Sequence, residues 1–262
     1  MRKTNLTSLV AALAIASSLT LTGCGGGSDT PPPAAQNNDD NIDDYEYDLS
    51  YIHASETDEY KNKTVDPYPN APAVSQEQMD AYLQAINEQR AKGADCNTRG
   101  VFPAAMPLVW NNKLYLSAQE HNYDMINATE VVGVDDDLEG EGYIGHGGSG
   151  TDTDWTATVW GLENTRSTHR QRAYNNGYDH IDTLDNLARY SKNLVSENPT
   201  ELEIARYAVN LWMNSDGHCA AIMYALYYDE DKEREMQGEM GMGYMENSAL
   251  DSYSWVYAIG YK

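Results

Sequence analysis

Apolar residues recur at helical spacing in three long stretches of the chain, and each stretch predicts an amphipathic helix. The first predicted helix opens with a capping box between Ser75 and Gln78 and is expected to end near Gly93. Its apolar residues at positions i, i+3, i+4 and i+7 are expected to form one buried face. They are Met79, Tyr82, Leu83 and Ile86.

The second predicted helix covers residues 113 to about 127, with Asn111 or Asn112 as its N-terminal cap. The third opens with a capping box between Thr200 and Glu203 and ends at a Ser-Asp-Gly turn. Both helices carry one apolar face, so both are expected to pack against a shared core.

The remaining pattern adds one short helix and two strands. The helix is predicted over residues 167–175, with Gly177 placed to end it in the left-handed conformation. Residues 241–245 and 254–259 have the composition of strands and are separated by a polar turn, which predicts a hairpin. Taken alone, these patterns predict one mixed α/β domain between residues 71 and 262.

The N-terminus has the pattern of an export signal. Arg2 and Lys3 precede an apolar run over residues 9–21 that is too short for a good membrane span. The run ends in Leu-Thr-Gly-Cys, which resembles a bacterial lipobox, so signal cleavage after residue 23 and lipidation of Cys24 are expected. An ordinary signal peptide, with Cys24 free or paired, is the alternative interpretation.

Residues 24–70 differ in composition from the rest of the chain. They are rich in Gly, Pro, Asn and Asp and poor in aliphatic residues. Such a segment buries too little apolar surface to offset the entropy of ordering it. We interpret it as an acidic disordered tether that holds the domain away from the membrane.

Charge restricts the kinds of partner that the protein can bind. The sequence has 41 acidic and 17 basic residues, which gives a formal net charge of −24. Binding to nucleic acid and electrostatic docking on anionic lipid both need basic surfaces, so the composition argues against both. An acidic surface suits a protein exposed outside the cytoplasm.

The most specific motif lies in residues 211–223, which read LWMNSDGHCAAIM. The pattern W-x-x-S-x-G-H-C-x-x-I-M resembles the signature of bacterial CAP-domain proteins, relatives of cysteine-rich secretory proteins, antigen 5 and pathogenesis-related 1. Further matches follow in the expected order, and the resemblance covers about residues 75–262. It implies a three-layer α-β-α sandwich with a central, mostly antiparallel sheet and a disulfide between Cys96 and Cys219.

The resemblance also implies a site. His146, in Gly145–Asp152, matches the first histidine of the CAP cavity, and His218 matches the second. Asp185 stands where the family has a glutamate, whereas the family's other glutamate is replaced by Arg206 or Tyr207. The residues that remain as candidate ligands of zinc or another divalent metal are therefore His146, His218 and Asp185.

Three functions are compatible with these residues. The leading hypothesis is a membrane-anchored, extracytoplasmic module of the bacterial cell envelope that binds lipid or protein ligands without catalysis. The first alternative is a divalent-metal-dependent hydrolase acting on peptide or cell-wall material, and the second is a purely structural surface protein. No residue is assigned a firm catalytic role, and a monomer that binds no nucleic acid is expected.

Overall fold

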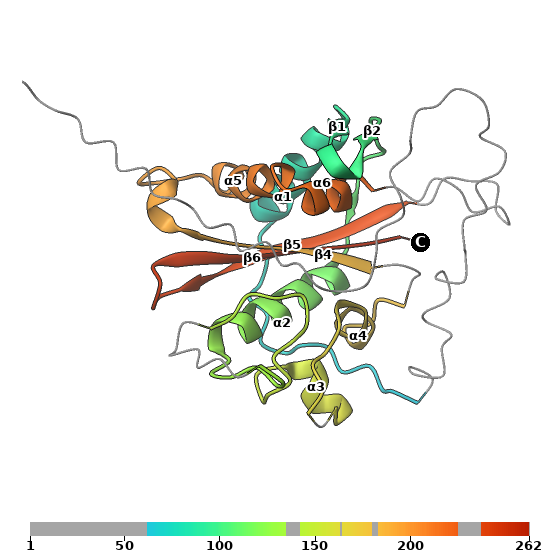
Figure 1. Cartoon of the computed structure of the whole chain (residues 1–262), viewed down its shortest axis with the longest axis vertical. Helices are drawn as coiled ribbons and strands as arrows, with labels where there is room; N and C mark the ends of the chain where they lie inside the picture. Colours follow the sequence, from blue (N-terminus) through green and yellow to red (C-terminus); the bar gives the residue numbers. More distant parts are fainter. Residues whose placement is uncertain (1–61, 135–141, 163, 180–182, 225–236, 262) are drawn as a thin grey trace, which may run out of the picture.

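The structure is a computed structural model that describes residues 62–134, 142–162, 164–179, 183–224 and 237–261 (Figure 1). The predicted signal peptide, Cys24 and the tether up to residue 61 lie outside the described residues. In the described part of the chain, no helix is both long enough and apolar enough to cross a membrane.

The described residues form a mixed α/β fold with helices and two sheets. The helices are α1 (Gln76–Arg90), α2 (Asn112–Asn127), α3 (Trp155–Trp160), α4 (His169–Asn175), α5 (Glu201–Met213) and α6 (Asp216–Met223), with short 3-10 turns η2 (Asn97–Arg99) and η3 (Lys192–Leu194). The strands are β1 (Ala94–Asp95), β2 (Val101–Phe102), β3 (Val109–Trp110), β4 (Thr183–Ser191), β5 (Gly238–Asn247) and β6 (Ser252–Tyr261).

Local capping residues fix where the helices begin. Both predicted capping boxes are present: Ser75 accepts from the backbone N–H of Gln78, and Thr200 accepts from that of Glu203. Asn111 caps α2 by accepting from the backbone N–H of Lys113. The helices predicted from apolar spacing are thus confirmed to within about two residues at their N-termini.

The larger sheet has the strand order β3-β5-β6-β4. The predicted C-terminal hairpin is confirmed, because β5 pairs antiparallel with β6, with Gly241 opposite Ala258. Strand β4 also pairs antiparallel with β6, whereas the short β3 pairs parallel with β5. Strands β1 and β2 form a separate two-stranded sheet. Strand β4 is consequently an edge of the larger sheet.

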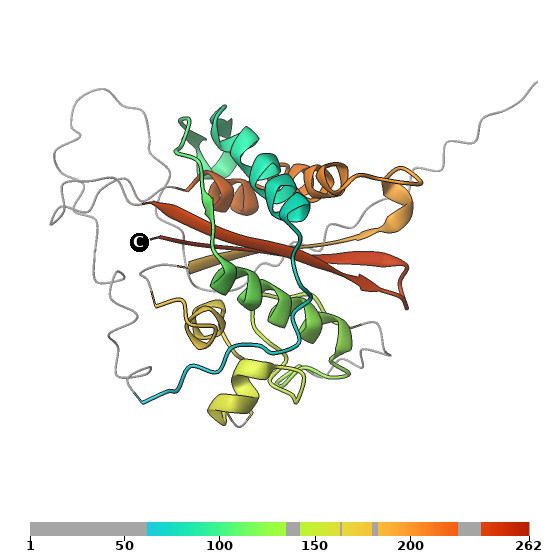
Figure 2. The ribbon, with the colours of Figure 1, turned by 180° about the vertical axis from the view of Figure 1, so that it is seen from behind.

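Helices lie on both sides of this sheet (Figures 1 and 2). Helices α1, α5 and α6 lie on one side, and α2, α3 and α4 lie on the other. Alternate residues of β6 point to opposite faces: Trp255 and Tyr257 join one core cluster, and Val256 and Ala258 join the other. Both faces of the strand are therefore buried against side chains.

Helix α2 approaches β5 very closely at Gly241. A Cβ added to this glycine would lie 2.0 Å from the backbone nitrogen of Tyr115. Only a residue without a side chain allows this approach. The absence of a side chain at this position therefore sets the distance between α2 and the sheet.

The segment before α1 lies along the α3 and α4 side of the molecule, where Figure 2 shows it running towards α1. The backbone N–H groups of Asp66 and Tyr68 donate to the side chains of Asn175 and Asn176, and Tyr68 is only 4% exposed. Lys63 donates to the carbonyl of Trp160 at 2.7 Å. The tether boundary predicted at residue 70 thus falls within a segment that contacts the folded domain.

Candidate functional site

The three residues of the predicted site come from distant parts of the sequence and meet beside the edge strand β4. Asp185 lies within β4, His146 lies in the segment that leads towards α3, and His218 lies in α6. The ring Nδ1 of His146 is 2.6 Å from Oδ1 of Asp185. The His146 and His218 rings are 6.4 Å apart between centroids. The site therefore joins elements from both sides of the sheet.

Arg172 on α4 fixes this pair in place. Its Nη2 donates to Oδ2 of Asp185 at 3.0 Å and to the backbone carbonyl of His146 at 2.8 Å. Its Nη1 donates to the carbonyl and the hydroxyl of Ser167. The arginine side chain is 2% exposed, so these bonds are shielded from water. One buried guanidinium thus holds both the backbone of His146 and the carboxylate that His146 binds.

The sequence-based site missed Arg172, although its segment was predicted to be helical. Nothing in the local pattern distinguishes this arginine from Arg170, two residues earlier. Its role depends on the packing of α4 against β4, which brings it to Asp185. Only the tertiary structure could have revealed it.

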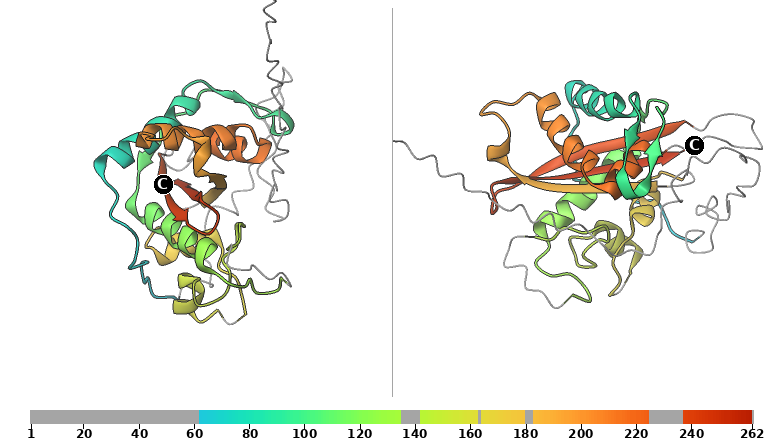
Figure 3. Two further views of the ribbon diagram at one scale, coloured as in Figure 1. Left: turned by 90° about the vertical axis from the view of Figure 1, so that its left-hand side faces the viewer. Right: turned by 45° about the horizontal axis from the view of Figure 1, so that its top comes forward.

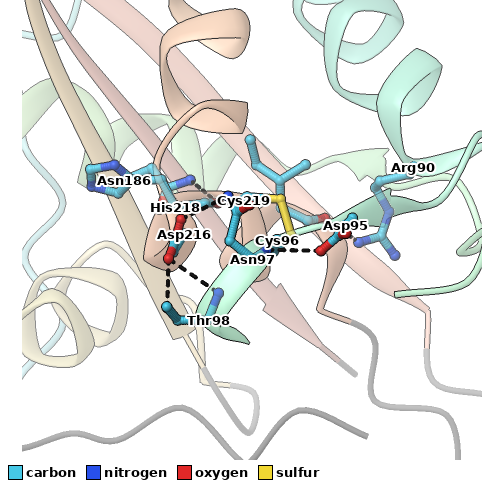
Figure 4. Close-up of a disulfide and its surroundings, with 10 residues drawn as sticks. Arg90, Asp95, Cys96, Asn97, Thr98, Asn186, Asp216, His218 and Cys219 are labelled. Carbon is cyan, nitrogen blue, oxygen red and sulfur yellow. Dashed lines mark hydrogen bonds between the residues drawn. A yellow bond between two sulfur atoms is a disulfide. The ribbon is translucent and has the colours of Figure 1, made fainter. Parts of the chain in front are cut away.

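Two sets of contacts hold the start of α6, where His218 lies (Figure 4). The adjacent Cys219 forms a disulfide with Cys96, with the two Cα atoms 5.6 Å apart, which agrees with the pairing implied by the family resemblance. Asp216 accepts hydrogen bonds from the side chain of Asn97 and from both the backbone N–H and the hydroxyl of Thr98. These contacts join the start of α6 to the η2 turn.

The start of α6 also contacts the larger sheet. The side-chain amide of Asn186 donates to the backbone carbonyl of His218 at 3.1 Å. Asn186 follows Asp185 in β4, and successive strand residues point to opposite faces. Strand β4 therefore supports one histidine from each of its faces.

The two site histidines have different protonation behaviour. The charge of Asp185 raises the pKa of His146, although burial acts in the opposite direction. Burial, together with nearby His146, lowers the pKa of His218 to about 4. Burial alone would raise the pKa of Asp185, but His146, His169 and Arg172 hold it well below its usual value. Near neutral pH, the site contains an ionised carboxylate, a readily protonated His146 and a neutral His218.

A buried polar network supports the segment that carries His146. Asp124 of α2 accepts hydrogen bonds from the hydroxyls of Tyr143, Ser149 and Thr153 and from the backbone N–H of Ser149. Ser149 is fully buried, so its hydroxyl serves the network.

His121, on the apolar face of α2, is a core residue. It has no exposed surface, and its Nε2 lies 2.7 Å from the carbonyl of Gly145. Burial lowers the pKa of its imidazole well below the ordinary value. His121 therefore supports the segment next to His146 as a neutral side chain.

Arg206 and Tyr207, which the CAP resemblance aligned with a second glutamate, serve the packing of α5. Arg206 forms a bidentate ion pair with Glu88 of α1, in which Nη2 of Arg206 lies 2.6 Å from Oε1 of Glu88. The Tyr207 ring lies 4.6 Å from the Tyr190 ring between centroids. Neither residue supplies a carboxylate to the site.

The donors at this site do not fit a metal ion. Zinc sites generally need three or four protein ligands with unoccupied lone pairs. Asp185 directs one oxygen to His146 and the other to the Arg172 guanidinium, whose positive charge opposes a metal ion at this carboxylate, so the two imidazoles are the donors that remain. Among the described residues, no three His, Cys, Asp or Glu side chains are placed to hold a metal together.

Comparisons with known proteins give no family assignment. No protein-family model matches the sequence, and neither the curated proteins nor the solved structures contain a significant match to it.

Proposed function

We propose that this protein is a lipid-anchored, extracytoplasmic CAP-like domain that binds a ligand at His146 and His218 and does not catalyse a reaction. In this proposal the helices on the two sides of the β3-β5-β6-β4 sheet form the α-β-α sandwich of CAP-domain proteins. Support for the fold comes from the motif in residues 211–223 and from the order of the other matching stretches.

One observation carries the proposed site: His146, Asp185 and His218 are far apart in sequence and are adjacent in space. Their convergence is expected if they act together. The side chain of His146 is 41% exposed, whereas that of Asp185 is 4% exposed. A buried acid that orients a partly exposed imidazole is a suitable arrangement for presenting a ring nitrogen to a ligand.

The same contacts argue against catalysis. A hydrolase needs a nucleophile or an activated water and a positioned base. The hydroxyl of Ser149 is bound to Asp124, and Cys219 is bound in the disulfide. The pairing of Asp185 with His146 is an arrangement that a histidine base can use, so the case against catalysis is that neither of these two nucleophilic side chains is free.

The lipid anchor rests on the sequence alone, because Cys24 lies outside the described residues. Cys24→Ala in the full chain is expected to abolish acylation and to release the protein from the membrane fraction. Unchanged membrane association and signal processing in this variant would contradict the anchor.

The binding function can be tested by following the six histidines of the full chain by NMR with imidazole-labelled protein. A small-molecule extract of the cell envelope is expected to shift the signals of His146 and His218. The signal of His121 should shift less than those of the two site histidines, because its ring has no exposed surface for a ligand to contact. If neither site histidine responds, the proposed binding site is wrong.

The hydrolase alternative is tested on the same samples. Zinc calorimetry is expected to show no saturable micromolar binding, because only two donors remain. Peptide and cell-wall substrates should stay intact with the wild type, with or without zinc. Zinc binding or hydrolysis that is lost in the His146→Ala, His218→Ala double variant would establish the alternative.

A further inference from the structure

Aromatic side chains form a continuous row on one face of the larger sheet. Tyr253 and Trp255 are two residues apart in β6 and therefore point to the same face. Tyr190 of β4 lies opposite Tyr253, and Tyr244 of β5 lies opposite Trp255. The centroids of the Tyr244 ring and the Trp255 ring are 4.7 Å apart. Pairing across three strands thus brings these rings together.

Helices extend the row at both ends. Tyr207 of α5 packs on Tyr190, with 4.6 Å between the ring centroids. Tyr82 of α1 packs edge-on against Trp255, with 5.7 Å between the centroids. Neighbouring centroids along the whole row are 4.6 to 6.2 Å apart. We call this row the aromatic series, and its order is Tyr207, Tyr190, Tyr253, Tyr244, Trp255, Tyr82, Trp110 and Tyr115.

Every ring of the aromatic series is a phenol or an indole. The sequence as a whole has 20 Tyr and 5 Trp but only 1 Phe. Phenylalanine fills a core as well as tyrosine does and buries no hydroxyl, so packing alone does not explain this bias. Phenol and indole rings can lose one electron to the oxidants found in biology, whereas a phenyl ring cannot. The aromatic series is therefore an unbroken row of oxidisable rings.

Burial indicates where an oxidised ring would persist. An oxidised tyrosine is long-lived only after its phenol proton has left, and the proton needs water or a base to receive it. Tyr190 is 5% exposed, and its hydroxyl donates to the carbonyl of Ile204, which is too weak a base to take the proton. Tyr207, Tyr244 and Tyr253 are half-buried, so water reaches them. These three tyrosines are the expected end points of oxidation.

Charged groups beside the aromatic series agree with this direction. Burial and, after it, the charge of Glu201 raise the pKa of Tyr82 and of Tyr244. The same carboxylate charge stabilises a positive charge that passes along these rings. Lys192, which is paired with Glu246, has its Nζ 5.6 Å from the centroid of the Tyr253 ring. Its charge disfavours a cation on that ring, so oxidised Tyr253 is expected as the neutral phenoxyl radical.

We propose that the aromatic series conducts one-electron oxidation through the protein, from Trp110 and the buried rings to the half-buried tyrosines at the other end. In each step an electron passes from one ring to its oxidised neighbour. At the last ring the phenol proton goes to water, which leaves a neutral phenoxyl radical. The first electron is taken by a one-electron oxidant such as a ferryl haem or an oxidised ruthenium complex. Oxidative modification is therefore directed to Tyr207, Tyr244 and Tyr253, independently of the proposed binding site.

The test starts the oxidation at the Trp110 end of the full chain. Asn112 is exposed in the first turn of α2, so Asn112→Cys can carry a covalent ruthenium–bipyridine complex. The Cys24→Ala background leaves this thiol free for labelling, because Cys96 and Cys219 form the disulfide. Light and a soluble electron acceptor oxidise the bound ruthenium, which then takes an electron from a nearby ring.

A nitroso spin trap captures the resulting tyrosine radicals, and peptide mass spectrometry locates the adducts. Adducts are expected at Tyr207, Tyr244 and Tyr253. Their yield per protein should not change on dilution, because the electrons move within one molecule.

Two variants interrupt the aromatic series at different places and keep a ring of nearly the same shape. Tyr82→Phe separates Trp110 from Trp255, so most of the adducts at all three end points should be lost. Tyr190→Phe interrupts only the step to Tyr207. The adduct at Tyr207 should then be lost, whereas those on β5 and β6 should remain.

Tyr257→Phe is the matched control. Tyr257 is 0% exposed in the same core cluster, and its ring packs on Trp212 with 5.9 Å between centroids. Its replacement should leave every adduct unchanged, and circular dichroism checks that each variant is folded. The proposal is wrong if the unaltered series gives no adducts, if the adducts persist in Tyr82→Phe, or if Tyr257→Phe loses them equally. A yield that falls on dilution would also overturn it.

Discussion

At the scale of single residues, the site depends on one buried carboxylate that serves two partners. Asp185 accepts from His146 on one oxygen and from Arg172 on the other. Its charge is the main reason that the pKa of His146 is raised. Asp185 therefore sets both the orientation and the protonation of the exposed imidazole.

Asp185→Asn is accordingly expected to lower the pKa of His146. When the carboxylate charge is lost, burial and the charge of Arg172 remain, and both favour the neutral imidazole. Histidine-resolved NMR titration measures the change. Asp216→Asn is the matched control, because Asp216 bonds only to Asn97 and Thr98 among the contacts described above. A pKa of His146 that is unchanged in Asp185→Asn would contradict this role.

The lowered pKa of His218 predicts a loss of stability in acid. The unfolded chain binds a proton at this residue below about pH 6.5, whereas the folded chain does so only below about pH 4. The free energy of unfolding should therefore fall as the pH drops through this window, by up to about 3 kcal/mol from this group. Buried His121 acts in the same direction.

His218→Gln should flatten this part of the profile, because glutamine does not titrate. Urea unfolding at a series of pH values between 7 and 4 measures the effect. Burial raises the pKa of Glu120 to about 7, so this residue changes the free energy of unfolding in the opposite direction. Its contribution is the same in the wild type and in His218→Gln. Equal slopes for the wild type and the variant would show that His218 is not the neutral buried group described here.

At the scale of elements, the fold depends on how closely α2 packs on the sheet. Leu114 and Ala118 of α2 lie in the same core cluster as Val256 and Ala258 of β6. Gly241 in β5 allows the helix backbone to come within contact distance of the strand. Because α2 also carries Asp124 and His121, this packing positions the segment that holds His146.

Gly241→Ala should therefore destabilise the protein by roughly 1–3 kcal/mol or more, since the new methyl group meets backbone that cannot move aside. Gly217→Ala in α6 is the matched control. No atom lies within 4 Å of a Cβ added there, so alanine should be neutral or stabilise by about 0.5–1 kcal/mol. Urea unfolding compares the two variants, and equal effects would contradict the close packing.

At the scale of the whole molecule, the disulfide joins two segments that are far apart in sequence, the residue between β1 and η2 and the helix α6. Figure 3 shows α1, α5 and α6 grouped on one side of the sheet, with the β1–β2 region beside α6. Cys96 and Cys219 are 123 residues apart, and both are 1% exposed. A crosslink over so long a segment strongly restricts the unfolded chain.

Replacing both cysteines by serine should lower the free energy of unfolding by about 2–5 kcal/mol. Urea unfolding with and without a reducing agent measures the difference. The double variant should be insensitive to the reductant, whereas the wild type should approach its stability once reduced. A wild type that is unaffected by reduction under denaturing conditions would show that the crosslink is absent.

The sequence by itself determined the elements whose signals are local. The capping boxes at Ser75 and Thr200 and the Asn111 cap depend on residues within one turn, so their positions could be predicted without knowing the fold. The hairpin of β5 and β6 is also local, because a short turn joins strands of suitable composition. The resemblance to CAP-domain proteins suggested His146, His218 and Asp185 as candidates, but not their distances.

Tertiary structure alone decided how those residues work. Three features involve partners in separate segments of the chain. They are the hydrogen bond from Arg172 to Asp185, the edge position of β4 in the sheet, and the packing of residues 62–70 on the domain. No periodicity encodes such contacts, because they arise only when helices pack on the sheet. The same packing brings a hydrogen-bond partner to each oxygen of Asp185, and for that physical reason the residue orients a histidine.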